Sequence, residues 1–142
     1  MFVLKDILTD KDILARTIYG EARGELHKFG KKSLCAIANV VLNRLKKGCY
    51  GKSVKEICLR PYQFSCWNKN DPNYGKLNQL KILDSVFSFC ESLAQDFLNT
   101  SLDSVVDYTD GATHYHHEAI KPYWADNSFR TAAIGTHIFY KL

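Results

Sequence analysis

The clearest hydrophobic periodicity in the chain lies in its first third, where apolar residues recur every three or four positions at Leu34, Ile37, Ala38, Val41, Leu42 and Leu45. This spacing predicts an amphipathic helix. Lys46 and Lys47 come next, and their charges suit the negative end of a helix dipole. Because Gly48 can adopt the left-handed conformation that commonly ends a helix, we expect the helix to stop there.

Two other helices are predicted on either side of this one. The first begins near Thr9, since Thr9 and Asp12 have the spacing of a capping box. Gly20 and Gly24 are expected to weaken and end it. The second covers about residues 76–99, where one face carries an apolar stripe made of Leu80, Leu83, Phe87, Cys90, Ala94 and Phe97.

A shorter helix and a loop are predicted between these elements. Ser53 and Glu56 have capping-box spacing, and Pro61 closes the segment that they begin. The residues from there to Gly75 include Pro72 and several asparagines, a composition typical of an ordered loop.

From residue 105 onward the pattern changes to β-branched and aromatic residues. This predicts short strands over residues 105–108, 113–117 and 136–140, with Pro122 to Asn127 connecting the last two. Helices first and a small antiparallel sheet last predict an α+β domain.

The composition of the chain fits one globular domain. Its 142 residues are 46% hydrophobic and 24% charged, which favours a single domain over residues 1–142 with one core. The net charge of +4 suits loose association with an anionic partner without identifying it. Lys and Arg are scattered rather than gathered in a stripe, so we expect no nucleic-acid partner, and we expect a monomer.

Neither a membrane span nor a secretory signal is predicted. The longest stretch without charged residues runs only from Ser33 to Asn43, short of the ~18 apolar residues that a spanning helix needs. The first residues carry Lys5 and Asp6 and have no long apolar core, so the route to any extracellular target stays open. The five cysteines are odd in number and have no CxxC spacing, which favours reduced, structural thiols.

The candidate for acid–base chemistry is Glu21, which follows a glycine near the predicted end of the first helix. Apolar neighbours such as Ile18 and Tyr19 could remove water from its carboxyl and raise its pKa toward the value that a general acid needs. The alternative is a surface glutamate that pairs with Arg16 or Arg23.

Glu25 follows four residues later. On one continuous helix the two carboxylates would be ~5–6 Å apart, close to the separation in a retaining glycosidase. Carboxylates on one helix face point the same way, however, and Gly24 interrupts the helix between them. We therefore expect a structural role for Glu25, which could accept hydrogen bonds from backbone N–H groups of the next segment.

A histidine-rich strand offers a second kind of site. His114 and His116 should point to one face of the strand, and Tyr115 and His117 to the other. With His137 as a third ligand, the first pair could bind zinc, although the chain has no HExxH motif. The alternative is a set of polar aromatic residues that lines a sugar groove.

Loop aromatic residues beside amide and hydroxyl groups are typical of carbohydrate recognition. The residues with this character are Gln63, Phe64, Ser65, Trp67 and, further along, Trp124. For Phe64 a packing role in the core is favoured, whereas Trp67 and Trp124 fit either role.

Taken together, these residues resemble the SleB-type cell wall hydrolases, a family of spore cortex-lytic enzymes and related phage and bacterial proteins. The resemblance covers nearly the whole chain, and its pieces are the run Ala15–Glu25, the helix Ala36–Arg44, the loop Pro61–Trp67, the strand Thr113–His116 and the end Ile134–Tyr140.

The resemblance implies a lysozyme-like or transglycosylase-like α+β domain that cleaves peptidoglycan glycan strands. It also implies that Glu21 is the catalytic acid. We expect Arg23 and Glu25 to be structural residues near the site, and we expect no metal or cofactor.

Our hypothesis is a lytic transglycosylase, since that reaction needs one carboxylate. Gln63, Ser65 and Tyr115 are candidates for holding the sugar. A muramidase that uses Glu21, a peptidoglycan-binding module without activity, and a zinc amidase built on the histidines stay as alternatives.

Overall fold

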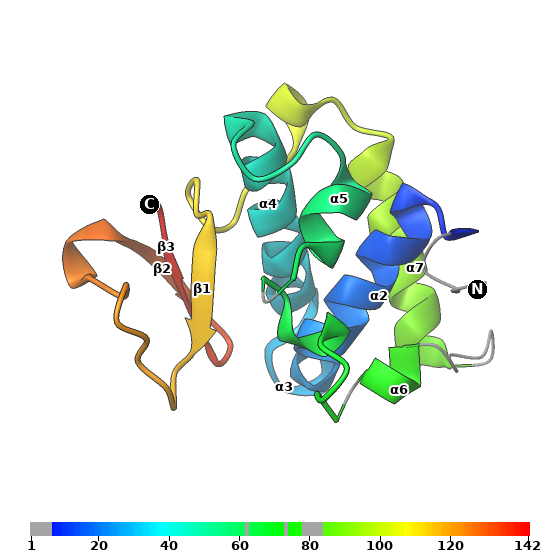
Figure 1. Ribbon diagram of the computed structural model, residues 1–142, viewed down its shortest axis with the longest axis horizontal. Helices are drawn as coiled ribbons and strands as arrows, with labels where there is room; N and C mark the ends of the chain where they lie inside the picture. The colour runs from blue at the N-terminus through cyan, green and yellow to red at the C-terminus, as the bar shows by residue number, and fades with distance from the viewer. Residues whose placement is uncertain (1–6, 62, 73, 78–83) are drawn as a thin grey trace.

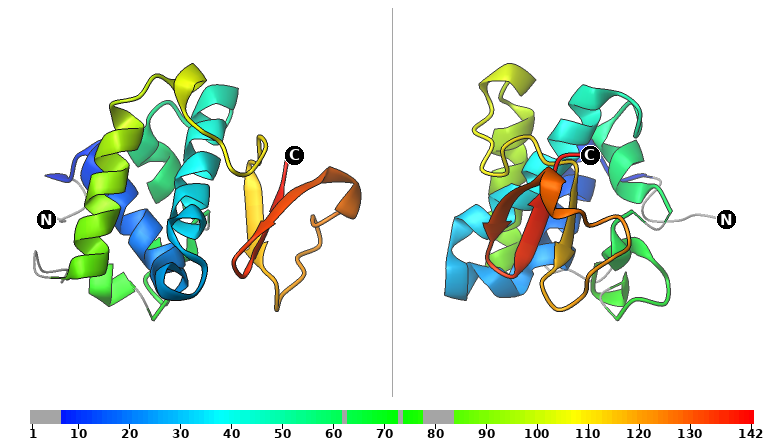
Figure 2. Two further views of the ribbon diagram at one scale, coloured as in Figure 1. Left: turned by 180° about the vertical axis from the view of Figure 1, so that it is seen from behind. Right: turned by 90° about the vertical axis from the view of Figure 1, so that its left-hand side faces the viewer.

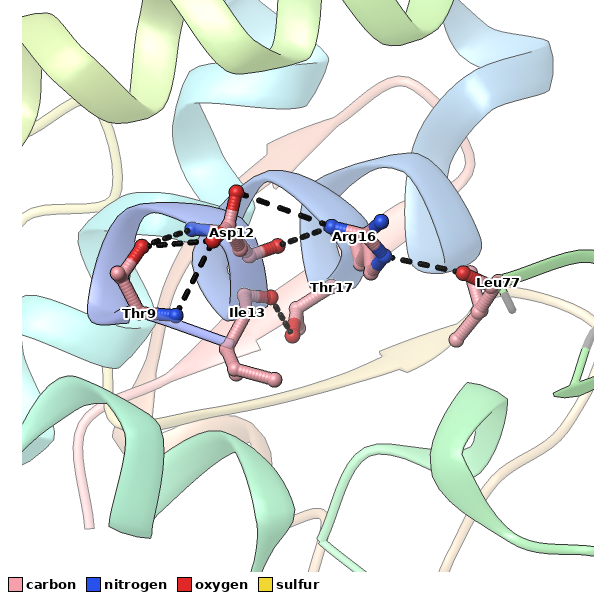
Figure 3. Close-up of polar contacts among 6 residues, drawn as sticks. All are labelled: Thr9, Asp12, Ile13, Arg16, Thr17 and Leu77. Atoms are coloured by element: carbon pink, nitrogen blue, oxygen red, sulfur yellow. Dashed lines mark hydrogen bonds and ion pairs between the residues drawn. The ribbon is translucent and has the colours of Figure 1, made fainter. Parts of the chain in front are cut away.

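The computed structural model describes residues 7–61, 63–72, 74–77 and 84–142. Helix α2 (Asp10–Ala22) begins with the predicted capping box. The Thr9 amide donates to the Asp12 carboxylate at 3.1 Å, and the Asp12 amide donates to the Thr9 hydroxyl at 3.2 Å (Figure 3). One turn later, Arg16 donates to the carbonyl oxygen of Leu77 at 3.0 Å and so ties α2 to the short helix α6 (Tyr74–Leu77).

Of the two glycines expected to weaken and end this helix, Gly20 does not end it, because α2 continues through Gly20 to Ala22, two residues before Gly24. Gly20 instead permits a close approach to the 3-10 turn η2 (Ser65–Trp67). A Cβ at Gly20 would lie 2.6 Å from Cβ of Cys66, closer than two such atoms can pack. The chain tightens into a 3-10 turn only afterwards, at η1 (Arg23–Glu25), and then forms α3 (Leu26–Phe29).

The central helix is confirmed. Helix α4 (Lys31–Lys47) ends at Gly48, whose φ of 88° is the predicted left-handed conformation. The short helix α5 (Val54–Leu59) follows, and its N-cap hydroxyl on Ser53 accepts a hydrogen bond from the Glu56 amide at 3.0 Å.

The helix predicted over residues 76–99 is shorter in the structure. Helix α7 (Ser85–Leu98) starts at the N-cap Asp84, whose carboxylate accepts from the Phe87 amide at 3.0 Å. Phe87, Cys90 and Ala94 are buried as the pattern predicts. Leu80 and Leu83 lie outside the described residues.

Three short strands form an antiparallel sheet in the order β1-β3-β2: β1 (His114–His117), β2 (Arg130–Ile134) and β3 (His137–Tyr140). The first and last strands were predicted and are confirmed. The middle strand, β2, was not predicted, because its alanine-containing sequence carries little β signal and its pairing with β3 holds it.

The strand predicted over residues 105–108 is wrong, because this segment is a loop after the 3-10 turn η3 (Leu102–Ser104). The Asn39 side chain satisfies its backbone in place of a neighbouring strand. The Asn39 amide donates to the Val106 carbonyl at 2.9 Å, and its carbonyl accepts from the Tyr108 amide at 3.1 Å.

Helix α4 lies between the sheet and the other helices (Figures 1 and 2). On one side it joins a large apolar core with α2, α5 and α7, and on the other it buries Ala36 and Val40 against Phe139 of the sheet. This arrangement confirms the α+β class with a small C-terminal antiparallel sheet.

In the described part of the chain, no helix is long and apolar enough to cross a membrane. All five cysteines are free thiols, and only Cys49 is exposed. The four buried thiols fill space in the helical part of the fold.

The contact at Gly20 yields a stability prediction. Gly20→Ala should lower the free energy of unfolding by about 1–3 kcal/mol, because the new methyl group overpacks against Cys66. Gly24→Ala is the matched control, since no atom lies within 4 Å of a Cβ there, and it should be neutral or stabilising by up to about 1 kcal/mol. Thermal denaturation of both variants tests this, and equal stability of the two would contradict it.

Candidate functional site

The Glu21 carboxylate lies in the last turn of α2 and is held by two other elements. Its Oε2 accepts hydrogen bonds from the Cys66 amide at 3.2 Å and the Ser65 hydroxyl at 3.4 Å, both from η2. Its Oε1 accepts from the phenol of Tyr115 in β1. The side chain is half-buried rather than turned outward into solvent.

The two arginines that could have paired with Glu21 are engaged elsewhere. Arg16 contacts Asp12 at 4.0 Å, and the guanidinium of Arg23 lies over the Tyr19 ring at 5.3 Å. The ion-pair alternative with Arg16 or Arg23 is therefore not realised, and the donors that hold the carboxylate within the described residues are neutral.

Burial raises the pKa of Glu21 above its ordinary value, while the hydrogen bonds from Tyr115 and Cys66 act in the opposite direction. The direction agrees with the sequence prediction, although the neighbours responsible differ in part. Tyr19, expected to cover the carboxyl, instead donates its hydroxyl to Asp84 at 2.9 Å. A carboxyl with a raised pKa keeps its proton to higher pH than an ordinary glutamate does, which is the property that a general acid needs.

Tyr115 donates a hydrogen bond to this carboxyl, and its ring is packed among other aromatic rings. Burial and the adjacent Glu21 hold the pKa of the phenol well above its ordinary value, so it stays protonated. Its ring contacts those of His137 and Phe139, with centroids 5.1 and 5.6 Å away, and of Phe64 at 6.4 Å. The sequence indicated a sugar contact for Tyr115, whereas the structure places its hydroxyl on Glu21.

The second glutamate of the motif has a different task. Glu25 is buried, and its Oε1 accepts from both the amide and the hydroxyl of Thr136 at 2.8 Å each. His137 Nδ1 lies 3.6 Å from the same oxygen. The expected structural role agrees with these contacts, but the bonded amide belongs to the β2–β3 turn rather than to the next segment.

The β2–β3 turn requires a glycine at position 135, where Glu25 packs against it. Gly135 has a φ of 59°, and a Cβ there would lie 2.6 Å from Oε1 of Glu25 and 2.8 Å from the Ser33 hydroxyl. The close approach lets Glu25 fasten the sheet to the helices, which fixes the position of Tyr115 relative to Glu21.

Arg44, which the sequence analysis did not single out, links the segment before β1 to the loop that carries Gln63. Its buried guanidinium donates to the Thr113 carbonyl at 2.7 Å and to the Gln63 side chain at 3.2 Å. It also lies 5.1 Å from the ring centres of Tyr50 and Phe64. The sequence carried one signal that Arg44 would be buried, because position 44 lies on the apolar face of α4, three residues after Val41.

Phe64 and Trp67 belong to the hydrophobic core. Phe64 is 1% exposed, and the Trp67 indole donates to the Thr17 hydroxyl at 2.8 Å, on the residue drawn in Figure 3. This leaves both with a packing role. Gln63 and Ser65, by contrast, are exposed, and of the two it is Ser65 that donates to Glu21.

Trp124 stays half-exposed and joins the histidine face of β1. Its ring lies 5.2 Å from His114, 5.9 Å from His116 and 5.5 Å from Tyr140. Burial, followed by the nearby positive charges of Arg44 and Lys47, lowers the pKa of His114 to about 4. His114 is therefore neutral near pH 7 and adds to an aromatic, uncharged surface.

The zinc constellation does not assemble. His116 shares a 2.8 Å hydrogen bond with the Tyr140 hydroxyl, and His137 lies beside Glu25 and Tyr115 instead of joining His114. Within the residues that the structure describes, no three His, Cys, Asp or Glu side chains gather to hold a metal ion.

Comparison with known families gives a match to the model described as Cell Wall Hydrolase, over residues 30–140. The chain belongs to the cell wall hydrolase family. The matched range is more than half of the chain and includes Tyr115 and Arg44, although Glu21 and Glu25 precede it. As the family name states, its members are enzymes that act on the cell wall.

Two solved structures share the fold of this cell wall hydrolase. The catalytic domain of the Bacillus cereus SleB protein is 20% identical with a TM-score of 0.65, over 93% of this chain and 89% of that one. The catalytic domain of the germination-specific lytic transglycosylase SleB from Bacillus anthracis is 21% identical with a TM-score of 0.61, over 99% and 97%. The search of curated proteins gives no match.

Replacing the phenol tests the electrostatics at Glu21. Tyr115→Phe should raise the pKa of Glu21 further, because the hydrogen bond from the phenol lowers that pKa. In the role of general acid expected from the sequence, Glu21 would work only while protonated, so the alkaline limb of the pH–activity profile should move to higher pH. Carbon-13 NMR titration of the Glu21 carboxyl measures the shift directly, and a lowered pKa would contradict the assignment.

A pair of variants tests the structural role of Glu25. Glu25→Ala removes the acceptor for Thr136 and should lower the free energy of unfolding by about 1–3 kcal/mol. Glu25→Gln keeps a carbonyl oxygen at that place and should cost clearly less. Chemical denaturation measures both, and an equal loss would show that the charge, not the acceptor, matters.

Proposed function

We propose that this cell wall hydrolase cleaves the glycan strands of peptidoglycan as a lytic transglycosylase, with Glu21 as its general acid and then its base. The observation that carries the proposal is the Glu21 carboxyl itself, half-buried, raised in pKa and held by donors from two other elements. The family of the chain and the lytic transglycosylase activity named for the B. anthracis relative support it.

In the first step, Glu21 gives its proton to the oxygen that joins N-acetylmuramic acid to N-acetylglucosamine, and the bond from C1 to this oxygen breaks. The resulting carboxylate then takes the proton of the muramic acid 6-hydroxyl as that oxygen attacks C1. The new bond closes a 1,6-anhydro ring, and Glu21 ends protonated as it began. No water enters the reaction.

The two oxygens of Glu21 have different surroundings, which favours Oε2 as the atom that transfers the proton. Oε1 faces the buried phenol of Tyr115, whereas Oε2 faces the exposed hydroxyl of Ser65. A hydroxyl can both donate and accept, so Ser65 can turn to suit either protonation state of Oε2. Gln63 lies two residues before Ser65 in the chain and accepts a hydrogen bond from Arg44. Its exposed side chain is available to bind a sugar hydroxyl or acetamido group.

A single working carboxylate suits this reaction. Glu25 is buried and engaged with Thr136, so it does not face a substrate. The transglycosylase scheme needs no second carboxylate, because the substrate supplies its own nucleophile.

One observation favours a second candidate, a muramidase that uses water in place of the 6-hydroxyl. The charge of Asp71 contributes to the raised pKa of Glu21, which places another carboxylate in the neighbourhood. A hydrolytic mechanism would use such a group to activate water or to stabilise the sugar cation.

Glu21→Gln tests the central role. The substitution keeps the size of the side chain but removes its proton transfer, so the rate of wall lysis should fall by about 10²–10⁴-fold. Turbidity clearing of purified peptidoglycan measures the rate, and Glu91→Gln on α7 serves as the matched control. Nearly intact lysis by Glu21→Gln would rule out the mechanism.

Product analysis separates the two reactions. Mass spectrometry of the digest should show 1,6-anhydro ends, and Asp71→Asn should leave the rate within about tenfold of the wild type, since general base catalysis by Asp71 would be worth at least ~10²-fold. Reducing ends together with a large loss in Asp71→Asn would establish the muramidase instead.

A further inference from the structure

A surface hollow lies where the chain turns from α4 into α5. It has a volume of about 620 Å³ and is lined by residues 48–52, Glu56 and residues 59–61. We call it the α4–α5 hollow. Its size falls within the range of small-ligand sites. Gly48, with a φ of 88°, forms part of its wall, and a Cβ there would meet no atom within 4 Å, so a ligand can approach the backbone at Gly48 closely. Gly51, also in the wall, packs instead against Ile57, which a Cβ would meet at 3.0 Å.

The charged groups in the hollow are two cations and one anion. Lys52 and Arg60 supply the positive charges, and Glu56 supplies the negative one. Arg60 donates to the Tyr50 carbonyl at 3.1 Å, which anchors it and leaves most of its five N–H donors for a ligand. Over the part of the chain that the structure describes, no carboxylate forms an ion pair with Lys52 or Arg60.

Neighbouring groups respond to the positive charge of this region. The pKa of His114 is lowered first by burial and then by the charges of Arg44 and Lys47, and Arg60 contributes to the lowered pKa of Arg44. Lys47 also lies 6.0 Å from the Tyr50 ring. The positive region therefore extends from the hollow to the histidine face of β1.

The hollow is joined to the surface around Glu21 by the chain itself. Pro61 lines the hollow, and Ser65, which bonds Glu21, is only four residues further on, a span of at most ~14 Å. The exposed Gln63 lies between them. On the other side, Tyr50 continues from the hollow to His114, with ring centres 5.9 Å apart.

We propose that the α4–α5 hollow binds the peptide stem that branches from the muramic acid residue next to the cleaved bond. This inference rests on the proposed function, since it assumes that the glycan strand passes in front of Glu21. A stem that is not cross-linked carries several carboxylates and one ammonium group. Arg60 and Lys52 fit the carboxylates, and Glu56 fits the ammonium.

Two substrates separate stem binding from glycan cleavage: peptidoglycan that bears stems, and glycan strands from which an amidase has removed them. The wild type should show a lower KM on the strands with stems. Lys52→Glu combined with Arg60→Glu should raise that KM about fivefold, as two exposed ion pairs are lost, and bring the ratio of the two KM values toward one.

Lys32→Glu is a control for charge reversal elsewhere on the surface, with half the charge change of the double variant. It lies near the opposite end of α4, about 24 Å along the helix from Gly48, and should leave the ratio unchanged. Circular dichroism checks that each variant is folded. Equal KM values of the wild type on both substrates, or an equal loss on both in the double variant, would overturn the proposal.

A binding measurement tests whether the stem peptide occupies the α4–α5 hollow without requiring catalytic turnover. In an NMR titration, a free stem tetrapeptide should shift the amide signals of Gly48, Gly51 and Arg60, and the same peptide with capped carboxyls should not. If the wild type cleaves neither strand, the proposed function fails, and this titration still tests the hollow. Absence of shifts, or shifts only with a glycerol phosphate oligomer, would overturn the stem peptide as its occupant.

Discussion

The structure depends on the meeting of three distant parts of the chain at the Glu21 carboxylate. Helix α2 carries it, the Cys66 amide reaches one oxygen, and the phenol of Tyr115 reaches the other. The first contact requires η2 to pack against α2, and the second requires the sheet to dock against α4. Gly20 makes the first possible, because a side chain there would collide with Cys66. The glycine before Glu21 therefore serves a close approach rather than a helix end.

The two glutamates of the motif have different surroundings. The Glu21 carboxyl has the exposed hydroxyl of Ser65 on one side and the half-buried Tyr115 phenol on the other, so its hydroxyl partners can suit either charge state. A structural anchor needs one fixed state. Glu25 meets that need with two donors from Thr136 on a single oxygen. The 3-10 turn η1 between them is what aims the two side chains at different partners.

Buried Arg44 shows how the remainder of the site is held. Its guanidinium joins the start of β1 to Gln63 and packs between two aromatic rings. Burial costs this cation part of its hydration, which appears as a lowered pKa. The hydrogen bonds and ring contacts offset that cost, and they keep the loop that carries Gln63 in place.

The elements that could be predicted from the amino-acid sequence are those whose signals lie within a few neighbouring residues. The capping box at Thr9, the periodic face of α4 and the glycine at its end are set by neighbouring residues, so their prediction agrees with the structure. Glu21 was singled out for the same reason, since its motif is contiguous. The segment around Val106 misled the prediction, because a side chain from α4 satisfies its backbone in place of a strand.

The groups that surround Glu21 depend on how distant parts of the chain pack together. Tyr115 lies far along the chain, and nothing in its neighbourhood in sequence shows that its hydroxyl meets that carboxyl. The partner of Glu25 and the separation of His137 from His114 depend in the same way on how the sheet docks against α4. Contacts of this kind follow from packing between elements, whereas sequence patterns report mainly on the chain within a few residues of each position.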